Sequence, residues 1–370
     1  MLQSLTNPGK TGTTGSLTIH DITAEAAQLP DYDGHEIVLH GIDRRRGLDA
    51  IVAIHDSTLG KAFGGTRIWQ HDTFETALSD VLRLSRGMTA KAAISGLPLG
   101  GGKAVIIADP QRDKTHAMLE AYAEMLQALD GIFATGEDVG VTLADADFLR
   151  ARTPNVSGTT IGGSGNPAPF TAQGVYLGIK AAVHHRFGHD MLAGKSIAVQ
   201  GLGSVGWALC EKLHADGARL TVADIDAARV EAAVTEFSAR KAAADAILAA
   251  DTDVFAPCAL GGVLSAEIIP VLRAEIVAGS ANNQLATNAD ADRLAARGVL
   301  YAPDYVINAG GLINAAFEVL PGGYDRTRAE ATVARIPATL DKIFRDAAAS
   351  GRTTEAVAAG MAEARIAAAA

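Results

Sequence analysis

The spacing of hydrophobic and polar positions alternates along this chain between the period of a strand and that of a helix. Residues 36–40 and 48–54 are short apolar runs joined by the basic turn 43–47, and they predict two β-strands. Residues 74–88 and 113–129 instead repeat apolar positions every three or four residues, which predicts two helices. The first part of the chain therefore predicts a mixed α/β layer.

The second half of the chain follows the order strand, glycine turn, helix, strand. Residues 196–200 form a buried-strand pattern, 205–216 a helix and 219–223 another strand, which together predict a parallel βαβ unit. The segment 156–167 consists almost entirely of Gly, Ser, Thr, Asn and Pro and predicts a hinge or domain boundary. We expect a disordered tail at 1–16, an N-terminal mixed α/β substrate and oligomerisation domain of 17–157 plus about 327–370, and a Rossmann-type doubly wound domain at 158–326.

Composition limits the classes of protein that suit this pattern. At 370 residues the chain is long enough for two domains, and 48% apolar with 20% charged residues suits packed cores. The net charge of -10 argues against nucleic acid or an anionic membrane as a partner. With two distant cysteines and no long apolar run or signal-peptide core, we expect a cytoplasmic protein without disulfides or a metal site.

A glycine-rich turn, GLGSVG, follows the strand at 196–200 and opens the next helix. Its first glycine allows a tight turn, its second leaves room for a pyrophosphate, and its third lets helix and strand pack closely. The N–H groups at the start of the helix can bind phosphate oxygens. The residues predicted to bind a dinucleotide here are Gly201, Gly203, Ser204, Val205 and Gly206.

Asp224 ends the second strand of this unit, eighteen positions after Gly206. A carboxylate at this position can accept hydrogen bonds from the ribose hydroxyls of the adenosine, whereas it repels a 2′-phosphate. The pattern therefore predicts NAD rather than NADP as the cofactor.

The stretch 87–103, GMTAKAAISGLPLGGGK, carries two lysines, Lys91 and Lys103, and a triple glycine before the strand pattern 104–108. The glycines suggest that a ligand approaches the backbone there, because no Cβ stands in the way. A lysine in such a place can clamp a carboxylate or, when partly desolvated, act as a base near neutral pH. An arbitrary lysine is more often a solvated surface residue, but the glycine context favours a functional site.

Polar loops follow several other predicted strands. The loop TGEDVG at 135–140 presents two adjacent carboxylates, and the loops 279–284 and 308–311 are rich in asparagine and glycine. In an open parallel sheet, loops at the carboxyl ends of strands line the cofactor crevice. Asparagines there can bind the nicotinamide ribose or a substrate amine, although a turn residue is an equally good interpretation of any one of them.

Together these motifs resemble the Glu/Leu/Phe/Val dehydrogenase family, and specifically its leucine and phenylalanine branch. The resemblance runs from about residue 36 to the C-terminus and includes IVAIHDSTLG, GGTRIW, GMTAKAA, GLPLGGGKAVII, TGEDVG, SGNPAPFTAQGV, VQGLGSVG, VFAPCALGG, GSANNQL and YAPDYVINAGG. It implies reversible, NAD-dependent oxidative deamination of a hydrophobic L-amino acid to a 2-oxoacid and ammonia. It also implies a homo-oligomer assembled through the first domain and a cleft between the two domains.

The resemblance assigns roles to individual residues. Lys91 would hold the substrate carboxylate, Lys103 would activate the attacking water, and Asp138 would exchange protons with the amine and the carbinolamine. Asn308 would lie near the substrate amine and the nicotinamide. Further cofactor contacts would be Thr171, Ala281 and Asn283, and the substrate side-chain pocket would include Phe63, Gly64, Gly65, Gly136, Leu312 and Ala315.

The pocket residues also bear on the choice of substrate. Phe63 stands where the glutamate branch carries a lysine, and an unpaired second carboxylate in an apolar pocket costs several kcal/mol, so glutamate should be rejected. Gly136 and Ala315 are smaller than the usual residues of the leucine branch and enlarge the pocket, whereas Phe63 is larger than the usual leucine. These changes oppose one another and leave leucine and phenylalanine unresolved, while GEDVG and SGNPAPFTA favour a leucine-like substrate.

Two other interpretations are weaker. A catalytically silent NAD-binding regulatory protein would be expected to have lost a lysine or the aspartate, and all three are present. A 2-hydroxyacid dehydrogenase would need a histidine with a carboxylate partner, and His55, followed by Asp56, lies in the wrong half of the chain. We expect His55 to be a structural histidine.

Overall fold

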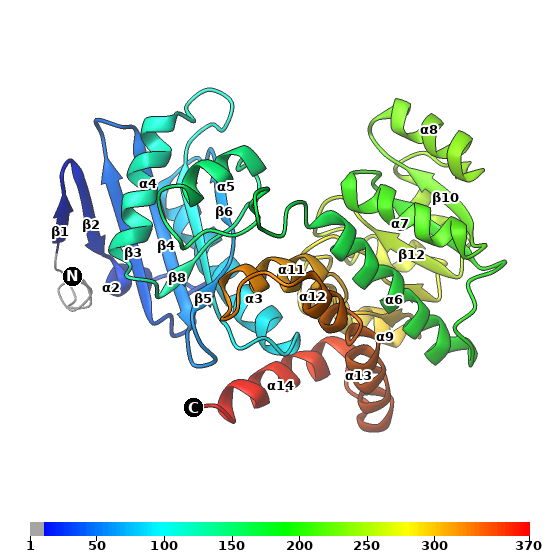
Figure 1. Ribbon diagram of the computed structural model, residues 1–370. Helices are drawn as coiled ribbons and strands as arrows, with labels where there is room; N and C mark the ends of the chain where they lie inside the picture. Colours follow the sequence, from blue (N-terminus) through cyan, green and yellow to red (C-terminus); the bar gives the residue numbers. More distant parts are fainter. Residues whose placement is uncertain (1–10) are drawn as a thin grey trace. The chain divides into compact units, whose positions relative to one another are not determined.

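The computed structural model describes residues 11–370, in which the chain forms two compact units (Figure 1). Unit 1 comprises Met1–Asn166, Asn314–Arg326 and Glu363–Ala370, and unit 2 comprises Pro167–Ile313 and Thr327–Ala362. These bounds differ from the expected ones mainly in that most of 327–370 belongs to unit 2. Residues 11–14, expected in a disordered tail, form a strand that pairs with the next one, and residues 1–10 of that tail lie outside the described residues.

Unit 1 is built on an eight-stranded mixed sheet, as the sequence pattern predicts. Its order is β1-β2-β3-β4-β7-β5-β8, with β6 also paired to β7. The pairs from β1 through β4 to β7 are antiparallel, whereas β5 and β6 run parallel to β7 and β8 runs parallel to β5. The strands are β1 (Thr11–Thr14), β2 (Leu17–Asp21), β3 (Ile37–Asp43), β4 (Leu48–Asp56), β5 (Ala62–Phe63), β6 (Thr66–Trp69), β7 (Gly100–Ile107) and β8 (Phe133–Ala134).

Helices cover both faces of this sheet. Successive side chains of a strand point to opposite faces, so Ile51 of β4 joins a core with Val81 while its neighbour Val52 joins a second core with Met125. The helices of unit 1 are α2 (Thr23–Ala26), α3 (Phe74–Ile94), α4 (His116–Ala128) and α5 (Leu143–Arg150). A side-chain oxygen caps the start of each of the three longer helices, and the N-cap residues are Thr73, Thr115 and Thr142.

Unit 2 contains a six-stranded, entirely parallel sheet in the order β11-β10-β9-β12-β13-β14. Numbered along the chain this is 3-2-1-4-5-6, the doubly wound order of a Rossmann fold, so this expectation is confirmed. The strands are β9 (Ser196–Gln200), β10 (Arg219–Ala223), β11 (Arg240–Lys241), β12 (Val254–Pro257), β13 (Ile276–Val277) and β14 (Leu300–Tyr301). The bounds of β9 and β10 agree with the predicted strands, and the helix between them begins one residue earlier than predicted.

The helices of unit 2 connect and cover these strands. They are α6 (Ala168–Phe187), α7 (Ser204–Ala215), α8 (Ala227–Phe237), α9 (Ala289–Ala296), α10 (Asp304–Ile307), α12 (Arg326–Val333), α13 (Ile336–Ser350) and the short 3-10 turns η1 (Ala246–Ala249) and η2 (Ile269–Val271). The helices α11 (Gly310–Val319) and α14 (Thr354–Ala367) begin in unit 2 and end in unit 1. None of the helices in residues 11–370 is both long and apolar enough to cross a membrane.

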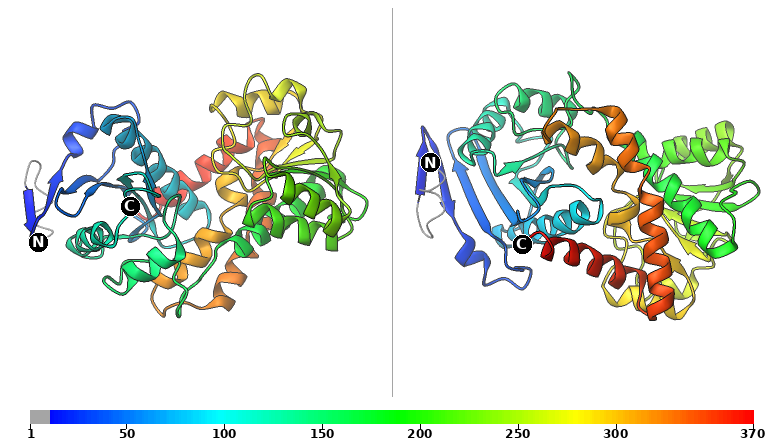
Figure 2. Two further views of the ribbon diagram at one scale, coloured as in Figure 1. Left: turned by 90° about the horizontal axis from the view of Figure 1, so that it is seen from above. Right: turned by 60° about the horizontal axis from the view of Figure 1, so that its bottom comes forward.

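The chain returns to unit 1 for the last time at Glu363, within α14, whereas the expected first domain resumes at about residue 327. Helix α13 stays in unit 2 because its apolar face packs on α6, where a Cβ on Gly178 would lie 2.9 Å from Leu340. The end of α14 lies beside α3 (Figure 2). The guanidinium of Arg365 donates there to the carbonyl oxygens of Ala93 (2.9 Å), within α3, and of Leu97 (3.0 Å), just after α3 ends.

Candidate active site

A buried ion pair joins two of the predicted catalytic residues of unit 1. The Nζ of Lys103, a residue only 6% exposed, lies 2.8 Å from Oδ2 of Asp138. The Nε of Arg67 donates to the same oxygen at 3.3 Å, and Nη1 of Arg67 binds Asp80 at 2.9 Å. Burial by itself raises the pKa of Asp138, but the charges of Lys103 and Arg67 and the bond from Lys103 lower it to about 2. Asp138 is therefore a carboxylate held by two cations.

Backbone pairing explains why these side chains meet. The strand β6 runs parallel to β7, so Arg67 and Lys103 lie on neighbouring strands. The loop that carries Asp138 lies along the other side of β6, where Thr66 N donates to Gly136 O at 2.9 Å and Ile68 N donates to Val139 O at 2.8 Å. Asp138 is therefore positioned by main-chain hydrogen bonds on both sides of it.

The glycines around this pair serve protein packing rather than the approach of a ligand, which corrects our expectation for the triple glycine. Gly100, Gly101 and Gly102 form the start of β7, and a Cβ on any of them would collide with other parts of unit 1. On Gly101 it would lie 2.1 Å from the backbone nitrogen of Thr89 in α3. On Gly64 it would lie 1.9 Å from the carbonyl oxygen of Gly102. These glycines bring α3, β5 and β7 close together and thereby support the lysines.

Most of the remaining predicted residues of unit 1 lie on elements next to this pair, whereas Ala315 lies on α11. Lys91 is half-buried near the end of α3, the helix that packs on β7. Phe63 is only 3% exposed in β5, which pairs with β7 on one side and β8 on the other. Gly65 adjoins Asp138 directly, since a Cβ on Gly65 would lie 3.0 Å from that of Asp138. The predicted residues that fall in unit 1 are Phe63, Gly64, Gly65, Lys91, Lys103, Gly136, Asp138 and Ala315.

In unit 2, the three glycines of the dinucleotide turn have the three expected environments. Gly201 has φ +98°, a backbone conformation that favours glycine. A Cβ on Gly206 would lie 2.0 Å from the carbonyl oxygen of Gly201, which shows how closely α7 approaches the turn. At Gly203, by contrast, no described atom lies within 4 Å of the Cβ position, so this side of the turn is open. The turn can therefore admit a pyrophosphate at the start of α7.

Asp224 lies directly beside this turn. Its Oδ2 accepts a hydrogen bond from Leu202 N at 2.5 Å, and its Oδ1 accepts one from Asp226 N at 2.8 Å. Arg229, which the sequence analysis did not single out, also reaches the turn, with Nη1 3.5 Å from Leu202 O and Nε 3.3 Å from Asp226 Oδ2. The signal in the sequence that could have identified Arg229 is its position three residues after Asp226, the N-cap of α8.

Asn308 holds the loop that follows β13. Its Nδ2 donates to Ser280 O at 3.1 Å and to Asn282 Oδ1 at 2.7 Å. The residue is 3% exposed, and within residues 11–370 its buried Oδ1 has no hydrogen-bond partner. A buried, unused acceptor suits a ligand that brings its own donor, such as an amine or an amide.

The other predicted residues of unit 2 surround this loop or the start of α11. Ala281 is buried, and Asn283 is exposed with φ +51°. Thr171 touches α11, since a Cβ on Gly311 would lie 2.6 Å from its Oγ1. The predicted residues that fall in unit 2 are Thr171, Gly201, Gly203, Ser204, Val205, Gly206, Asp224, Ala281, Asn283, Asn308 and Leu312.

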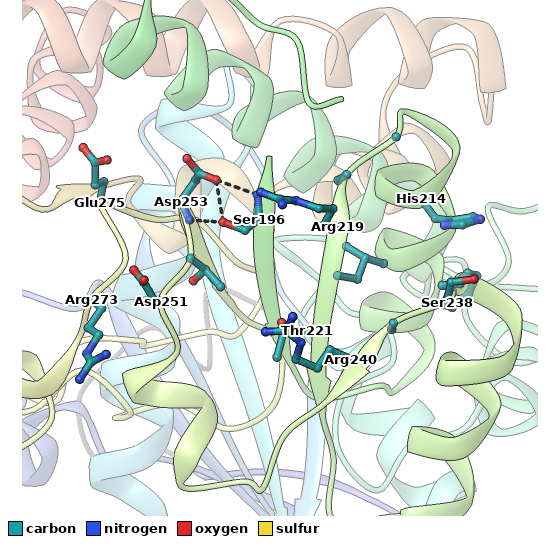
Figure 3. A pocket seen from close by; sticks show the side chains of 16 residues that line it. Ser196, His214, Arg219, Thr221, Ser238, Arg240, Asp251, Asp253, Arg273 and Glu275 are labelled. Atoms are coloured by element: carbon teal, nitrogen blue, oxygen red, sulfur yellow. Dashed lines mark hydrogen bonds between the residues drawn. The ribbon is translucent and has the colours of Figure 1, made fainter. Parts of the chain in front are cut away.

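Two other features of the structure contain none of the predicted site residues. A hollow of about 790 Å³ lies at the amino ends of β9, β10, β12 and β13, opposite the glycine turn, where Asp253 accepts hydrogen bonds from the N and Oγ of Ser196 (Figure 3). His55 is packed edge-on against His35 and bonds Oγ1 of Thr89 at 2.9 Å. This packing agrees with a structural role for His55.

Comparison with known proteins identifies relatives across most of the chain. Residues 38–154 match the family described as Glu/Leu/Phe/Val dehydrogenase, dimerisation domain, and residues 219–370 match Glutamate/Leucine/Phenylalanine/Valine dehydrogenase. Leucine dehydrogenase of Geobacillus stearothermophilus is 49% identical over 91% of this chain and 92% of its own length. Phenylalanine dehydrogenase of Bacillus thermotolerans is 43% identical over 90% and 88%. The crystal structure of L-tryptophan dehydrogenase from Nostoc punctiforme superposes with a TM-score of 0.79 at 46% identity, covering 91% of this chain and 97% of that one.

Proposed function

Because this chain belongs to the Glu/Leu/Phe/Val dehydrogenase family, and is therefore an amino acid dehydrogenase, we propose that it oxidises a leucine-like L-amino acid. The products are the 2-oxoacid and ammonia, and the reaction is reversible. The observation that carries the proposal is the buried pair of Lys103 and Asp138, which combines a base candidate with a proton-exchanging carboxylate.

The contacts of Asp138 suggest how this pair changes during the reaction. In the free protein Asp138 is held by Lys103 and Arg67, and its pKa of about 2 makes it a poor proton acceptor near neutral pH. We infer that the substrate amine, on binding beside Asp138, replaces Lys103 as the partner of that carboxylate. Lys103 then becomes free to activate the water that attacks the imine, and Asp138 can exchange protons with the amine. Lys91, on the helix packed against β7, is proposed to hold the substrate carboxylate.

Unit 2 is proposed to bind NAD. NAD, when bound, accepts the hydride from the Cα of the substrate. The open side of the turn at Gly203 and the carboxylate of Asp224 beside it suit a pyrophosphate and an unphosphorylated adenosine ribose. Thr171, Ala281 and Asn283 are proposed to contact the nicotinamide half, and the unused Oδ1 of Asn308 can accept a hydrogen bond from its carboxamide or from the substrate amine.

The side-chain specificity is proposed to come from apolar residues and glycines. Phe63 offers no charge to a second carboxylate, and a buried unpaired carboxylate costs several kcal/mol. There is little space for a side chain at Gly136, because a Cβ there would lie 2.9 Å from Oγ of Ser157. Together with Leu312 and Ala315, both half-buried on α11, these residues would accept a branched aliphatic side chain and reject glutamate. A relative is named for leucine, another for tryptophan and another for phenylalanine, so aromatic substrates are the alternative.

The test is NAD reduction over a panel of L-amino acids: leucine, valine, phenylalanine, tryptophan and glutamate. We expect the highest kcat/KM with leucine or valine and at least a hundredfold lower value with glutamate, roughly what a desolvated unpaired carboxylate costs. Highest activity with phenylalanine or tryptophan would assign the enzyme to the aromatic alternative. Failure to reduce NAD with every amino acid, with NAD still bound, would favour a non-catalytic NAD-binding protein.

We also propose that the two units have different roles. Unit 1 would hold the substrate and mediate assembly into a homo-oligomer, because the matched dimerisation-domain family covers residues 38–154 of this unit. Unit 2 would hold the dinucleotide. A cytoplasmic location is proposed from the resemblance and from the unpaired cysteines Cys210 and Cys258.

A further inference from the structure

One carboxylate in unit 1, that of Glu318, accepts four hydrogen bonds from a single glycine-rich segment. Its Oε1 accepts from the backbone nitrogens of Gly158 and Ser164, both at 2.7 Å, and from Oγ of Ser164. Its Oε2 accepts from Oγ1 of Thr159 at 2.9 Å. The donors span residues 158–164, so the segment folds around the end of the Glu318 side chain. Hydrogen bonds to an ionised acceptor are roughly twice as strong as neutral ones.

The sequence of the segment is adapted to this carboxylate. A Cβ on Gly163 would lie 2.6 Å from Oε2 of Glu318 and 2.1 Å from Oγ1 of Thr159. Gly158 has φ +79°, a conformation that favours glycine. Two glycines of the segment are therefore required where they stand, one by space and one by backbone conformation.

The bonded segment lies next to the first two of the four places where the chain passes between the two units. One crossing follows Asn166, two residues after Ser164, and the next follows Ile313, within α11. Asn314, fully buried and one helical turn before Glu318, donates from Nδ2 to Ser164 O at 3.1 Å. Oδ1 of Asn314 in turn accepts from Tyr324 OH at 2.8 Å. Ser164 thus donates from its N and Oγ to Glu318, and its carbonyl oxygen accepts from Asn314.

We propose that Glu318, assisted by Asn314, is a positioning residue for the dehydrogenase reaction, because it ties together two of the four chain segments that connect the units. Both crossings adjoin proposed site residues: Thr171 follows the first, and Leu312 and Ala315 flank the second. With these bonds intact, residues 314–318 of α11 and the segment 158–164, which leads into α6, are held in one arrangement. Without these bonds, the part of α11 that carries Ala315 is held less reproducibly, and we expect binding of the amino acid to weaken. The inference rests on the proposed function for its kinetic consequence only.

The central experiment compares Glu318→Ala with Glu318→Gln and with a matched control in the same segment. Glutamine keeps one oxygen where Oε1 accepts three bonds, and its NH2 group can donate to Thr159, so it should preserve the tie. The control is Asp147→Ala, because Asp147 accepts from N and Oγ1 of Thr160 in the same segment but belongs to α5. We expect Glu318→Ala to lower kcat/KM for the amino acid at least tenfold, mainly through KM. Glu318→Gln and Asp147→Ala should stay within about threefold of the unchanged protein.

Two further measurements separate positioning from loss of fold. The Kd for NAD should stay within twofold in Glu318→Ala, since the Gly201–Gly206 turn belongs to unit 2 and the four bonds to unit 1. Amide hydrogen exchange should accelerate at Gly158 and Ser164 in Glu318→Ala, and at Thr160 in Asp147→Ala. If Glu318→Ala does not fold, Ser164→Ala, which removes one bond to the carboxylate, and Gly163→Ala, which displaces it, replace that variant.

The possible outcomes are distinct. Unchanged kinetics in Glu318→Ala, or an equal loss in Asp147→Ala, would overturn the proposal. So would a lower kcat with unchanged KM and a lower melting temperature, which is the signature of a purely structural residue. If the unchanged protein oxidises no amino acid, the proposed function fails by itself. Hydrogen exchange alone then tests whether Glu318 holds the segment, and unaltered exchange at Gly158 and Ser164 in Glu318→Ala would refute that claim.

Discussion

Replacing Asp138 by asparagine tests the proposed acid–base pair most directly. The carboxylate oxygen that accepts from Lys103 Nζ at 2.8 Å and from Arg67 Nε at 3.3 Å would lose its charge, and an amide cannot exchange protons with the substrate. Loss of an acid–base group lowers the rate by about a hundredfold to ten-thousandfold. We therefore expect kcat of Asp138→Asn to fall by at least about a hundredfold while NAD still binds.

The same substitution has a calculable effect on stability. Burial by itself raises the pKa of Asp138, but Lys103 and Arg67 outweigh burial and lower the pKa from an ordinary value of 3.8 to about 2. A difference of about 1.8 in pKa corresponds to about 2.4 kcal/mol of folding stability at neutral pH. Because the folded state has the lower pKa, this contribution is present above pH 3.8 and is lost as the pH falls from 3.8 to about 2. The substitution also leaves Lys103 buried without its partner, so the total loss at pH 7 should be about 2–5 kcal/mol.

Urea unfolding at pH 7 and at pH 3, combined with steady-state kinetics, measures both effects. The stability gap between the unchanged protein and Asp138→Asn should narrow at pH 3, because below pH 3.8 the unfolded chain takes up a proton at Asp138 while the folded protein, with its lower pKa, largely does not. The matched control is Asp145→Asn: Asp145 accepts from Lys114 Nζ at 2.6 Å and caps α5 through Thr142. This control should lose stability and keep kcat within about twofold. A kcat of Asp138→Asn that stays within a few-fold of the unchanged enzyme would refute the assigned role.

Three further predictions concern the pocket and the cofactor. Phe63→Ala should lower the free energy of unfolding by about 3–5 kcal/mol and reduce the leucine-to-phenylalanine ratio of kcat/KM by about tenfold or more; a stability loss with an unchanged ratio would assign Phe63 to the core alone. Asp224→Ala should increase turnover with NADP and so narrow the preference for NAD, and a second substitution, Arg229→Ala, should remove this increase. Equal turnover with NAD and NADP in the unchanged protein would contradict this reasoning. Gly206→Ala should lower the melting temperature, whereas Gly203→Ala should fold normally and raise the KM for NAD. An unchanged melting temperature of Gly206→Ala would show that α7 can move away from the turn.

Local patterns predicted unit 2 well. The strand before the glycine turn, the strand that ends at Asp224 and the helix between them are all specified by residues within 30 positions of one another. A parallel βαβ unit of this kind has few alternatives, because its crossover and its glycines restrict both handedness and spacing. The separate environments of Gly201, Gly203 and Gly206 follow from the same geometry.

The sequence pattern did not predict which distant segments of the chain contact one another. The triple glycine at 100–102 was interpreted as space for a ligand, but Thr89 of α3 occupies the space beside Gly101. Nothing near 100–102 in the sequence says which element will pack there, since a glycine permits the approach of a ligand and of a helix alike. Arg67 was noted only as part of GGTRIW, and its bond to Asp138 depends on two segments 71 residues apart. Glu318 is separated from its partners by more than 150 residues.

The ion pair at the proposed active site shows why such distant contacts decide chemistry. A carboxylate as enclosed as that of Asp138 would, with burial alone, have a raised pKa and be neutral more often, and two cations from neighbouring strands reverse that effect. Arg67 also bonds Asp80 of α3, so its charge is shared between two carboxylates and it is held in place by a contact that does not involve Lys103. When a substrate amine displaces Lys103, Arg67 can therefore remain and keep Asp138 oriented. The arginine fixes the carboxylate, and the lysine is the member of the pair that is free to change partner.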